Sequence, residues 1–259
     1  MLEVEHLTKR FGGLTAVADV SFAIAQGEIV AVFGPNGSGK TTLLSMIAGV
    51  LAPTAGMIRY RGTSLVGLPP NRVVALGIAK TFQNPQLFEE LTVVEHLRIA
   101  GHLMLKRRLG WRRLLTLFGG ATDGERTVDA RADRVVALCR LDRARDTIAA
   151  DLSYGQEKML GVAMALMCEP ELLLLDEPAS GLGHGEVTEL ERVLRDLRDQ
   201  GTTLCIIDHQ VKFLGRLADR AISLQHGAKI ADGPPQDVLS RPEVIAAYLG
   251  ASHAADTAA

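Results

Sequence analysis

The feature that most constrains the fold of this chain is a glycine-rich segment, residues 34–41, with the sequence Gly-Pro-Asn-Gly-Ser-Gly-Lys-Thr. It follows Ile29–Phe33, a continuously apolar run typical of a strand covered on both faces, and it precedes a helical run at Thr42–Ala48. Glycines let backbone N–H groups converge on phosphate oxygens at a helix N-terminus, where the helix dipole also favours negative charge. The order strand, loop, helix therefore predicts an α/β core with a phosphate-binding loop.

The residues of this loop have expected roles at a bound nucleotide. Lys40 should reach the β- and γ-phosphates, and the hydroxyl of Thr41 should ligate Mg²⁺. One short segment thus places both the nucleotide and the metal ion. The residues expected to contact the nucleotide are Gly34, Pro35, Asn36, Gly37, Ser38, Gly39, Lys40, Thr41 and Thr42.

A second part of the same site follows the apolar run Leu172–Leu175, which predicts a buried strand. The run ends in two carboxylates, Asp176 and Glu177, at the end where parallel strands present groups to ligands. Asp176 is expected to hold the magnesium shell and Glu177 to polarise the attacking water. A strand end that meets solvent could carry the same pair, but the phosphate loop favours the functional interpretation. Kinases and GTPases share both motifs. The two motifs therefore predict nucleotide binding but do not indicate what the protein does with the nucleotide.

The order of the remaining elements indicates that a helical segment interrupts the α/β core. From about residue 93 to 151, apolar residues recur at helical spacing, and apolar or β-branched runs predict strands on both sides of this segment. The predicted strands are Val20–Ile24, Ile29–Phe33, Met57–Tyr60, Ile78–Phe82, Leu172–Leu175, Leu204–Ile207 and Ala221–Leu224. A hairpin is expected at His226-Gly227, and a short helix near the end of the chain.

The size of the chain fits one large domain with a satellite. It has 259 residues, of which 47% are hydrophobic and 22% charged, enough apolar material for a substantial core. We expect a single domain over residues 1–259, with a core at about 1–92 and 160–250, a helical subdomain at about 93–159 and a flexible tail at 251–259.

Composition and charge exclude several other classes of protein. The 28 basic and 30 acidic side chains give a net charge of −2, so nucleic acid is not an expected partner. Cys139, Cys168 and Cys205 show no metal-ligand spacing and are expected to be buried, inert thiols in a reducing compartment. The sequence has no basic-then-apolar leader and no apolar run near the ~20 residues of a spanning helix. We therefore expect any membrane contact to be peripheral.

A third motif narrows the function. Leu152–Gln156, with the sequence Leu-Ser-Tyr-Gly-Gln, lies about twenty residues before the Asp-Glu pair and ahead of a helix, and it resembles the Leu-Ser-Gly-Gly-Gln signature of ABC ATPases. A serine hydroxyl and a glycine backbone at a helix N-terminus form a second anion site. In that family the signature closes on ATP held by a partner subunit. The resemblance thus implies that Ser153, Gly155 and Gln156 bind the partner's nucleotide, with ATP and Mg²⁺ as cofactors.

The resemblance implies further site residues. Gln83 resembles the glutamine that reaches the metal ion and attacking water, and His209 the histidine that contacts the γ-phosphate. Phe11 resembles the aromatic residue that stacks on adenine, with Val17 beside it. Each of these taken alone has an ordinary packing or surface explanation, whereas their order between the stronger motifs favours function. The implied fold is a P-loop NTPase core, a mixed sheet flanked by helices with an antiparallel β subdomain, plus a helical signature subdomain.

Particular segments are similar to the larger ATPase of branched-chain amino acid importers, and urea and amide importers use close relatives. These segments are Leu7–Gly13, Thr81–Asn84, Leu87-Phe88, Leu91–Val93, the long insert before the signature, Tyr154 within the signature, and Pro242–Gly250. The resemblance implies an ATPase with a second ABC ATPase subunit, two transmembrane permease subunits and, indirectly, a solute-binding protein as partners. It implies a peripheral location on the cytoplasmic face of the inner (plasma) membrane. An exporter or lipopolysaccharide-transport ATPase, or a soluble ABC ATPase of DNA repair or translation, remains an alternative.

Two segments depart from the expected pattern. Gly183-His184 stands where relatives commonly carry Asn or Asp followed by Pro, and it either weakens communication with one partner site or is a neutral change in a loop. The basic stretch at residues 106–113, with apolar residues after it, fits either contact with anionic lipid or permease, or a helix packed on the satellite.

Overall fold

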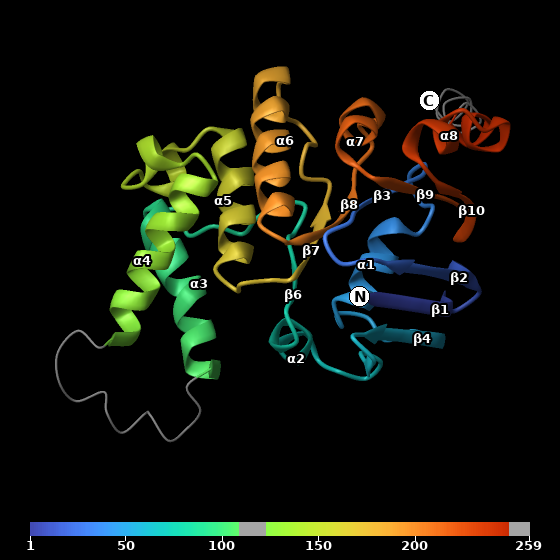
Figure 1. Cartoon of the computed structure of the whole chain (residues 1–259), viewed down its shortest axis with the longest axis horizontal. Helices are drawn as coiled ribbons and strands as arrows, with labels where there is room; N and C mark the ends of the chain where they lie inside the picture. Colours follow the sequence, from blue (N-terminus) through green and yellow to red (C-terminus); the bar gives the residue numbers. More distant parts are fainter. Residues whose placement is uncertain (109–122, 249–259) are drawn as a thin grey trace. The chain divides into compact units, whose positions relative to one another are not determined.

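The structure, a computed structural model, describes residues 1–108 and 123–248, without the side chains of residues 102–125 (Figure 1). It consists of two compact units. The core unit comprises residues 1–80, 171–181 and the described residues from 197 onward, and the helical unit comprises the described residues of 81–170 together with 182–196.

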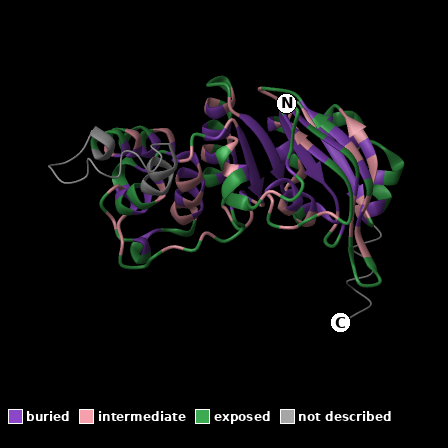
Figure 2. Cartoon of the chain, turned by 90° about the horizontal axis from the view of Figure 1, so that it is seen from below, coloured by how far each residue is buried: buried purple, intermediate pink, exposed green. Residues whose placement is uncertain are grey.

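Six strands form the main sheet of the core unit, in the order β10-β9-β3-β8-β7-β6. Their bounds are β3 (Ile29–Phe33), β6 (Ile78–Lys80), β7 (Leu172–Asp176), β8 (Thr203–Ile207), β9 (Arg220–Gln225) and β10 (Ala228–Gly233). All neighbouring pairs are parallel except β9 and β10, which form the hairpin predicted at His226-Gly227. Every residue of β3, β7 and β8 is buried, as Figure 2 shows for this sheet. This burial on both faces explains the continuous apolar runs in the sequence.

A second, antiparallel sheet of the core unit has the order β2-β1-β4-β5. Its strands are β1 (Leu2–Phe11), β2 (Leu14–Ile24), β4 (Ala55–Tyr60) and β5 (Thr63–Ser64). The strand β1 is absent from the strands predicted above, because its alternation of buried and exposed residues shifts within the strand. The register with β2 is irregular between Val4 and Leu7, and His6 and Asp19 adopt positive φ values of 49° and 52°.

Helices cover the sheets of the core unit. They are α1 (Lys40–Ile47), α2 (Pro70–Ala75), α7 (Val211–Leu217), α8 (Pro235–Leu239) and a further helix at 242–248. α1 buries Leu43, Leu44 and Ile47 in one hydrophobic cluster that also contains residues of β1, β3, β7 and β9. The helix that begins at the phosphate loop is thus part of the main core.

The helical unit is built from α3 (Val93–Arg108), α4 (Asp123–Leu138), α5 (Tyr154–Leu166), the first part of α6 (His184–Asp199) and two 3₁₀ turns, η2 (Asp142–Ala144) and η3 (Ala149–Asp151). The apolar residues that recur at helical spacing in the sequence lie on the buried face of α4 and just after its end. Val128, Ala132, Val135, Val136 and Cys139 are all buried.

The helical unit begins earlier in the chain than the approximate boundary at residue 93. Backbone hydrogen bonds explain the difference: Ala149 N–H donates to Leu91 O at 2.9 Å, Ala150 N–H donates to Glu89 O at 3.2 Å, and Thr92 and Ile148 form a β-bridge. Residues 81–92 therefore pack with the helices. These pairings join positions almost sixty residues apart, which no local pattern reveals.

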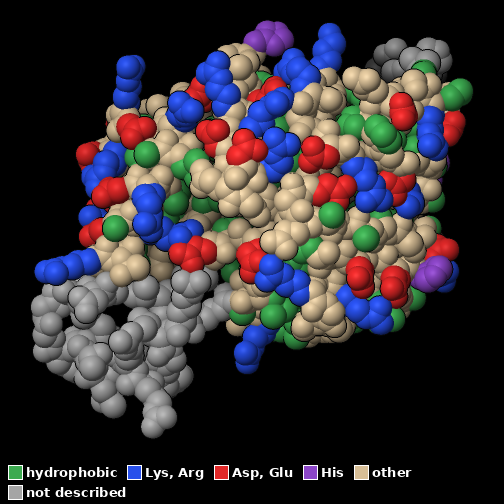
Figure 3. Space-filling model, in the orientation of Figure 1, with side chains coloured by type: hydrophobic (Ala, Val, Ile, Leu, Met, Phe, Trp, Pro, Cys, Tyr) green, Lys and Arg blue, Asp and Glu red, His purple; other side chains and the backbone are tan. Residues whose placement is uncertain are grey.

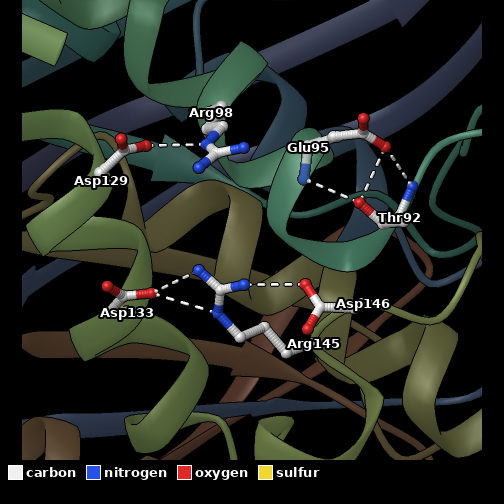
Figure 4. Close-up of polar contacts among 7 residues, drawn as sticks. All are labelled: Thr92, Glu95, Arg98, Asp129, Asp133, Arg145 and Asp146. Carbon is white, nitrogen blue, oxygen red and sulfur yellow. Dashed lines mark hydrogen bonds and ion pairs between the residues drawn. The ribbon is translucent and has the colours of Figure 1, made fainter.

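Ion pairs and a helix cap connect segments of the helical unit around α3 and α4 (Figure 4). Arg98 pairs with Asp129 of α4 at 2.7 Å, and Arg145 pairs with Asp133 at 2.9 Å and with Asp146 at 2.7 Å. The Glu95 carboxylate accepts from both the N–H and the hydroxyl of Thr92, and these hydrogen bonds lower the pKa of Glu95. The pairs are exposed, so they orient the helices more than they stabilise them.

Two segments singled out in the sequence lie wholly or partly outside the described residues. The tail at 251–259 lies wholly outside them, and of the basic stretch at 106–113 only the backbone of residues 106–108 is described. Among the described helices, none is both long and apolar enough to cross a bilayer. On the face drawn in Figure 3, basic and acidic side chains are interspersed.

The three cysteines are reduced, but they are not equally buried. Cys139 and Cys205 are buried, and burial raises the pKa of each thiol to about 12, which fits the prediction of inert thiols. Cys168 is only partly buried, in contrast to the prediction. It lies two residues past the end of α5.

Candidate functional site

The phosphate loop connects β3 to α1 as the sequence predicts. Gly39 occupies the N-cap position of α1 with a φ of 98°, in the region that side chains disfavour. A Cβ atom at Gly39 would lie 2.2 Å from the carbonyl oxygen of Ala16, so no other residue fits there. The loop therefore packs closely against β2. The first N–H groups of α1, like those at the start of any helix, have no partner within the helix and can bind an anion.

The Lys40 amine lies inside the loop. Lys40 is 7% exposed, and its Nζ donates to the carbonyl oxygens of Gly34 at 2.8 Å and Pro35 at 2.9 Å. Burial lowers the pKa of Lys40, while the nearby carboxylates of Glu177 and Asp176 oppose this shift. A cation held by neutral carbonyls beside two carboxylates is suited to receive a phosphate group.

A cavity of about 320 Å³ opens beside the loop. Its walls are the loop residues, Glu177, and three residues around the turn between β1 and β2, namely Phe11, Leu14 and Ala16. Phe11 is 46% exposed and Leu14 is 67% exposed, so this wall presents apolar surface to the cavity. The cavity thus combines an apolar end with an anion-binding end, as a nucleotide requires.

Some predicted contacts differ from this cavity lining. Asn36 to Thr42 and Phe11 line the cavity, but Gly34, Pro35 and Val17 do not. Val17 is fully buried, and a Cβ atom at Gly39 would lie 3.3 Å from one of its methyl groups. Val17 therefore supports the loop from below. Sequence reasoning missed Leu14 and Ala16, although their place in the hairpin that begins at Phe11 is a usable signal.

Asp176 and Thr41 present oxygen atoms to one another. The Thr41 hydroxyl donates to Asp176 Oδ1 at 3.3 Å, and the Lys80 ammonium pairs with Asp176 Oδ2 at 2.9 Å. Asp176 is the last residue of β7 and is almost completely buried. A hydroxyl and a carboxylate next to a phosphate loop are the hard oxygen ligands that Mg²⁺ takes, so these residues fit the expected ion. No pattern in the sequence indicates the role of Lys80.

Glu177 lines the cavity with an unusual backbone conformation. Its φ is +50°, in the left-handed region that costs a residue with a Cβ atom about 1–3 kcal/mol. The Glu177 N–H donates to Ile207 O at 2.8 Å, at the end of β8, which holds this conformation in place. The turn directs the chain away from the sheet immediately after the carboxylate.

His209 follows β8, and the residues around it are tied to the segment after Glu177. The buried Asp208 carboxylate accepts from Ala179 N–H at 2.8 Å and from Gln210 N–H at 2.9 Å, and the Gln210 side chain donates to Ala179 O at 2.6 Å. The exposed His209 ring has its Nδ1 3.7 Å from Asp208 Oδ1. Asp208, which is not among the residues predicted from the sequence, therefore ties the backbone next to His209 to the segment that follows Glu177.

The signature residues lie in the helical unit, at the start of α5. Ser153 is the N-cap: its hydroxyl accepts from Gln156 N–H at 3.3 Å, and the Gln156 side chain accepts from Ser153 N–H at 2.9 Å. A Cβ atom at Gly155 would lie 2.2 Å from Glu186 Oε1. The exposed first turn of α5 thus presents a preformed helix N-terminus.

Two other predicted positions also lie in the helical unit. The backbone carbonyl of Gln83 accepts a hydrogen bond from the buried Lys158 ammonium, which also lies 5.4 Å from the centroid of the Tyr154 ring. The Gly183 N–H donates to Glu186 Oε2 at 2.9 Å at the start of α6. The roles of Gln83 at the metal ion and of Gly183-His184 in coupling stay predictions.

Comparisons with known proteins agree with this geometry. A family model described as ABC transporter matches residues 17–180, and one described as branched-chain amino acid ATP-binding cassette transporter matches residues 228–254. The chain is 38% identical over 251 residues to the high-affinity branched-chain amino acid transport ATP-binding protein LivG of Salmonella typhimurium, covering 96% of this chain and 98% of the relative. It is 37% identical over 253 residues to BraF of Pseudomonas aeruginosa, with the same coverage.

Solved structures give the same result. An ATP-binding cassette of an ABC transporter in its ADP conformation superposes with a TM-score of 0.81 at 27% identity, covering 96% of this chain and 98% of that one. A dimeric bacterial ABC transporter cassette superposes with a TM-score of 0.75 at 25% identity, covering 91% and 99%. The fold class predicted from the sequence is therefore confirmed.

The Asp208 contacts predict a stability effect. In Asp208→Asn, the amide offers one acceptor in place of two, so either Ala179 N–H or Gln210 N–H meets a donor group. We expect the free energy of unfolding, measured by urea denaturation of the intact chain, to fall by about 1–3 kcal/mol. Asp142→Asn, at an exposed position, is the matched control and should change it by less than about 0.5 kcal/mol. Equal stability of Asp208→Asn and the wild type would contradict a stabilising role of the Asp208 hydrogen bonds to Ala179 and Gln210.

Proposed function

The chain belongs to the ATP-binding family of ABC transporters and is an ATPase, and from this premise we propose that it energises an importer of branched-chain amino acids. The observation that carries the proposal is the match of residues 228–254 to a model specific to branched-chain amino acid transporters. LivG and BraF are similar to this chain over almost its whole length, and their names as branched-chain amino acid transport proteins support the proposal. Import of urea, amides or other amino acids is the second candidate, since related importers use similar ATPases.

The residues around the loop divide the work of hydrolysis. Lys40 and the N–H groups of α1 bind and orient the phosphates. Thr41 and Asp176 are the residues that would hold Mg²⁺, with Gln83 as a further expected ligand, and the ion when bound neutralises phosphate charge. Glu177 is proposed to polarise the attacking water and His209 to contact the γ-phosphate. Positioning and charge stabilisation supply most of the acceleration in such a reaction.

The active unit is proposed to be a pair of ATPase subunits. Each nucleotide would lie between the phosphate loop of one chain and the Ser153 segment of the other, with Gly155 and Gln156 beside it. The N-terminus of α5 supports this, because it is preformed and exposed and a helix N-terminus attracts phosphate. A preparation of this chain alone is expected to bind ATP and to hydrolyse it poorly. The second subunit is either a copy of this chain or a different ABC ATPase.

Two transmembrane permease subunits are the further proposed partners, with a solute-binding protein acting through them. The helical unit exposes two large aromatic residues, Phe82 at 68% and Phe88 at 61%, in the segment that contains Gln83. Aromatic residues are enriched at protein interfaces, so these two support a contact between this segment and a partner. We propose that the chain lies peripherally on the cytoplasmic face of the inner membrane, where it would contact these permease subunits.

The role of Glu177 is tested by Glu177→Gln in the assembled transporter. The amide keeps the size of the side chain but cannot act as a base, so we expect ATP binding to persist while turnover falls ~10²-fold or more. Turnover is measured by phosphate release. Glu3→Gln, at an exposed position in β1, should retain wild-type turnover. Near-normal turnover in Glu177→Gln would refute the assignment of this residue.

The transported substrate is tested with the complete transporter in liposomes, with its permeases, partner ATPase and solute-binding protein. We expect ATP-driven uptake of radiolabelled leucine, isoleucine or valine, and loss of that uptake when this chain carries Glu177→Gln. Uptake of urea or a short amide in place of the branched-chain amino acids would favour the second candidate.

A further inference from the structure

We propose that Tyr248 is a positioning residue of the nucleotide site, which holds the first residue of the phosphate loop from the C-terminal helix at 242–248. The Tyr248 hydroxyl accepts a hydrogen bond from Gly34 N–H at 2.9 Å. The two residues are 214 positions apart in sequence, and both belong to the core unit. The proposal rests on ATP binding by this chain and does not depend on which solute is transported.

Gly34 lies where the sheet can no longer pair its N–H group. The last ladder pairs of β3 are Val32 with Ile207 of β8 and Phe33 with Ser223 of β9. Gly34 comes one residue later and turns out of the strand with a φ of 148°. A buried backbone donor must find an acceptor, and the Tyr248 hydroxyl is the acceptor that this donor has.

The position of Gly34 matters because its carbonyl oxygen accepts from Lys40 Nζ at 2.8 Å. Gly34 is thus held by Tyr248 through its N–H group and in turn holds the loop lysine through its carbonyl. No side chain fits at this position, since a Cβ atom at Gly34 would lie 2.3 Å from Leu224 O and 2.5 Å from Ser38 Oγ. The Tyr248 hydroxyl therefore sets the start of the loop that presents Lys40 to phosphate.

The helix at 242–248 has its own anchors, which place Tyr248 independently of the loop. Val244 and Ala247 are buried, whereas Ile245 on the same helix is exposed. Burial raises the pKa of Tyr248, while the hydrogen bond from Gly34 N–H lowers it. With burial the larger influence, the phenol keeps its proton at neutral pH and accepts as a neutral hydroxyl. The residue lies within the segment, 228–254, that matches the branched-chain amino acid transporter model. The segment thereby gains a role at the nucleotide site.

Tyr248→Phe tests the proposal, because it removes the hydroxyl and keeps the ring. We expect the Kd for ATP of the intact chain, measured by isothermal titration calorimetry, to rise about three- to tenfold, the scale of one lost hydrogen bond. In the assembled transporter the KM for ATP should rise by a similar factor. Hydrogen exchange of the backbone amides of Gly34 and of residues 36–40 should become faster. Ile245→Ala is the matched control on the same helix and should leave all three quantities unchanged.

Two outcomes would overturn the proposal. If Tyr248→Phe binds ATP with the wild-type Kd, the hydroxyl has no part in positioning the loop. If Kd rises but exchange at Gly34 and residues 36–40 is unchanged, the effect does not act through Gly34. Failure of the transport proposal has a different signature, because an importer of another solute would still show the expected ATP Kd and exchange changes.

Discussion

The parallel pairing of three completely buried strands, β3, β7 and β8, is the constraint on which the rest of the structure depends. Buried strands cannot carry unpaired charge, so the charged side chains of these three segments lie at or beyond the strand ends. These groups lie at one edge of the sheet, the one formed by the carboxyl-terminal ends of the three strands. The phosphate loop with Lys40 follows β3, Asp176 and Glu177 lie at the end of β7, and Asp208 and His209 follow β8. The chemistry is concentrated there because the sheet allows it nowhere else along these strands.

The charges at this edge are balanced in pairs. Two carboxylates next to a site for a triphosphate would repel it, and the structure offsets this repulsion with Lys40 in the loop and Lys80 beside Asp176. The Thr41 hydroxyl and the Asp176 carboxylate are oxygen ligands of the kind that a divalent cation takes, so the metal ion and the nucleotide are expected to strengthen each other's binding. Glu177 has a left-handed backbone conformation, and the Asp208 contacts to Ala179 and Gln210 fix the backbone beside His209, so the two residues proposed to act on water and the γ-phosphate lie in constrained segments.

Local patterns are sufficient to predict the buried strands, the phosphate loop and the helix faces, because each depends on the residues of one short segment. They fail where partners are distant or the backbone is irregular. The irregular backbone at His6 and Asp19 interrupts the alternation of buried and exposed residues by which β1 could be predicted. Residues 89–92 pair with residues 148–150, and because no local pattern indicates this pairing, the start of the helical unit before residue 93 could not be predicted. Lys80, Asp208 and Tyr248 act through partners as many as 214 residues away, and no spacing in the sequence indicates them.

The most direct test of this edge of the sheet is calorimetric titration of ATP into the intact chain with and without Mg²⁺. We expect Mg²⁺ to tighten ATP binding to the wild type and to Asp142→Asn. In Asp176→Asn this gain should disappear while binding of ATP itself persists. An equal gain from Mg²⁺ in Asp176→Asn would contradict the assignment of this edge of the sheet as the metal and nucleotide site.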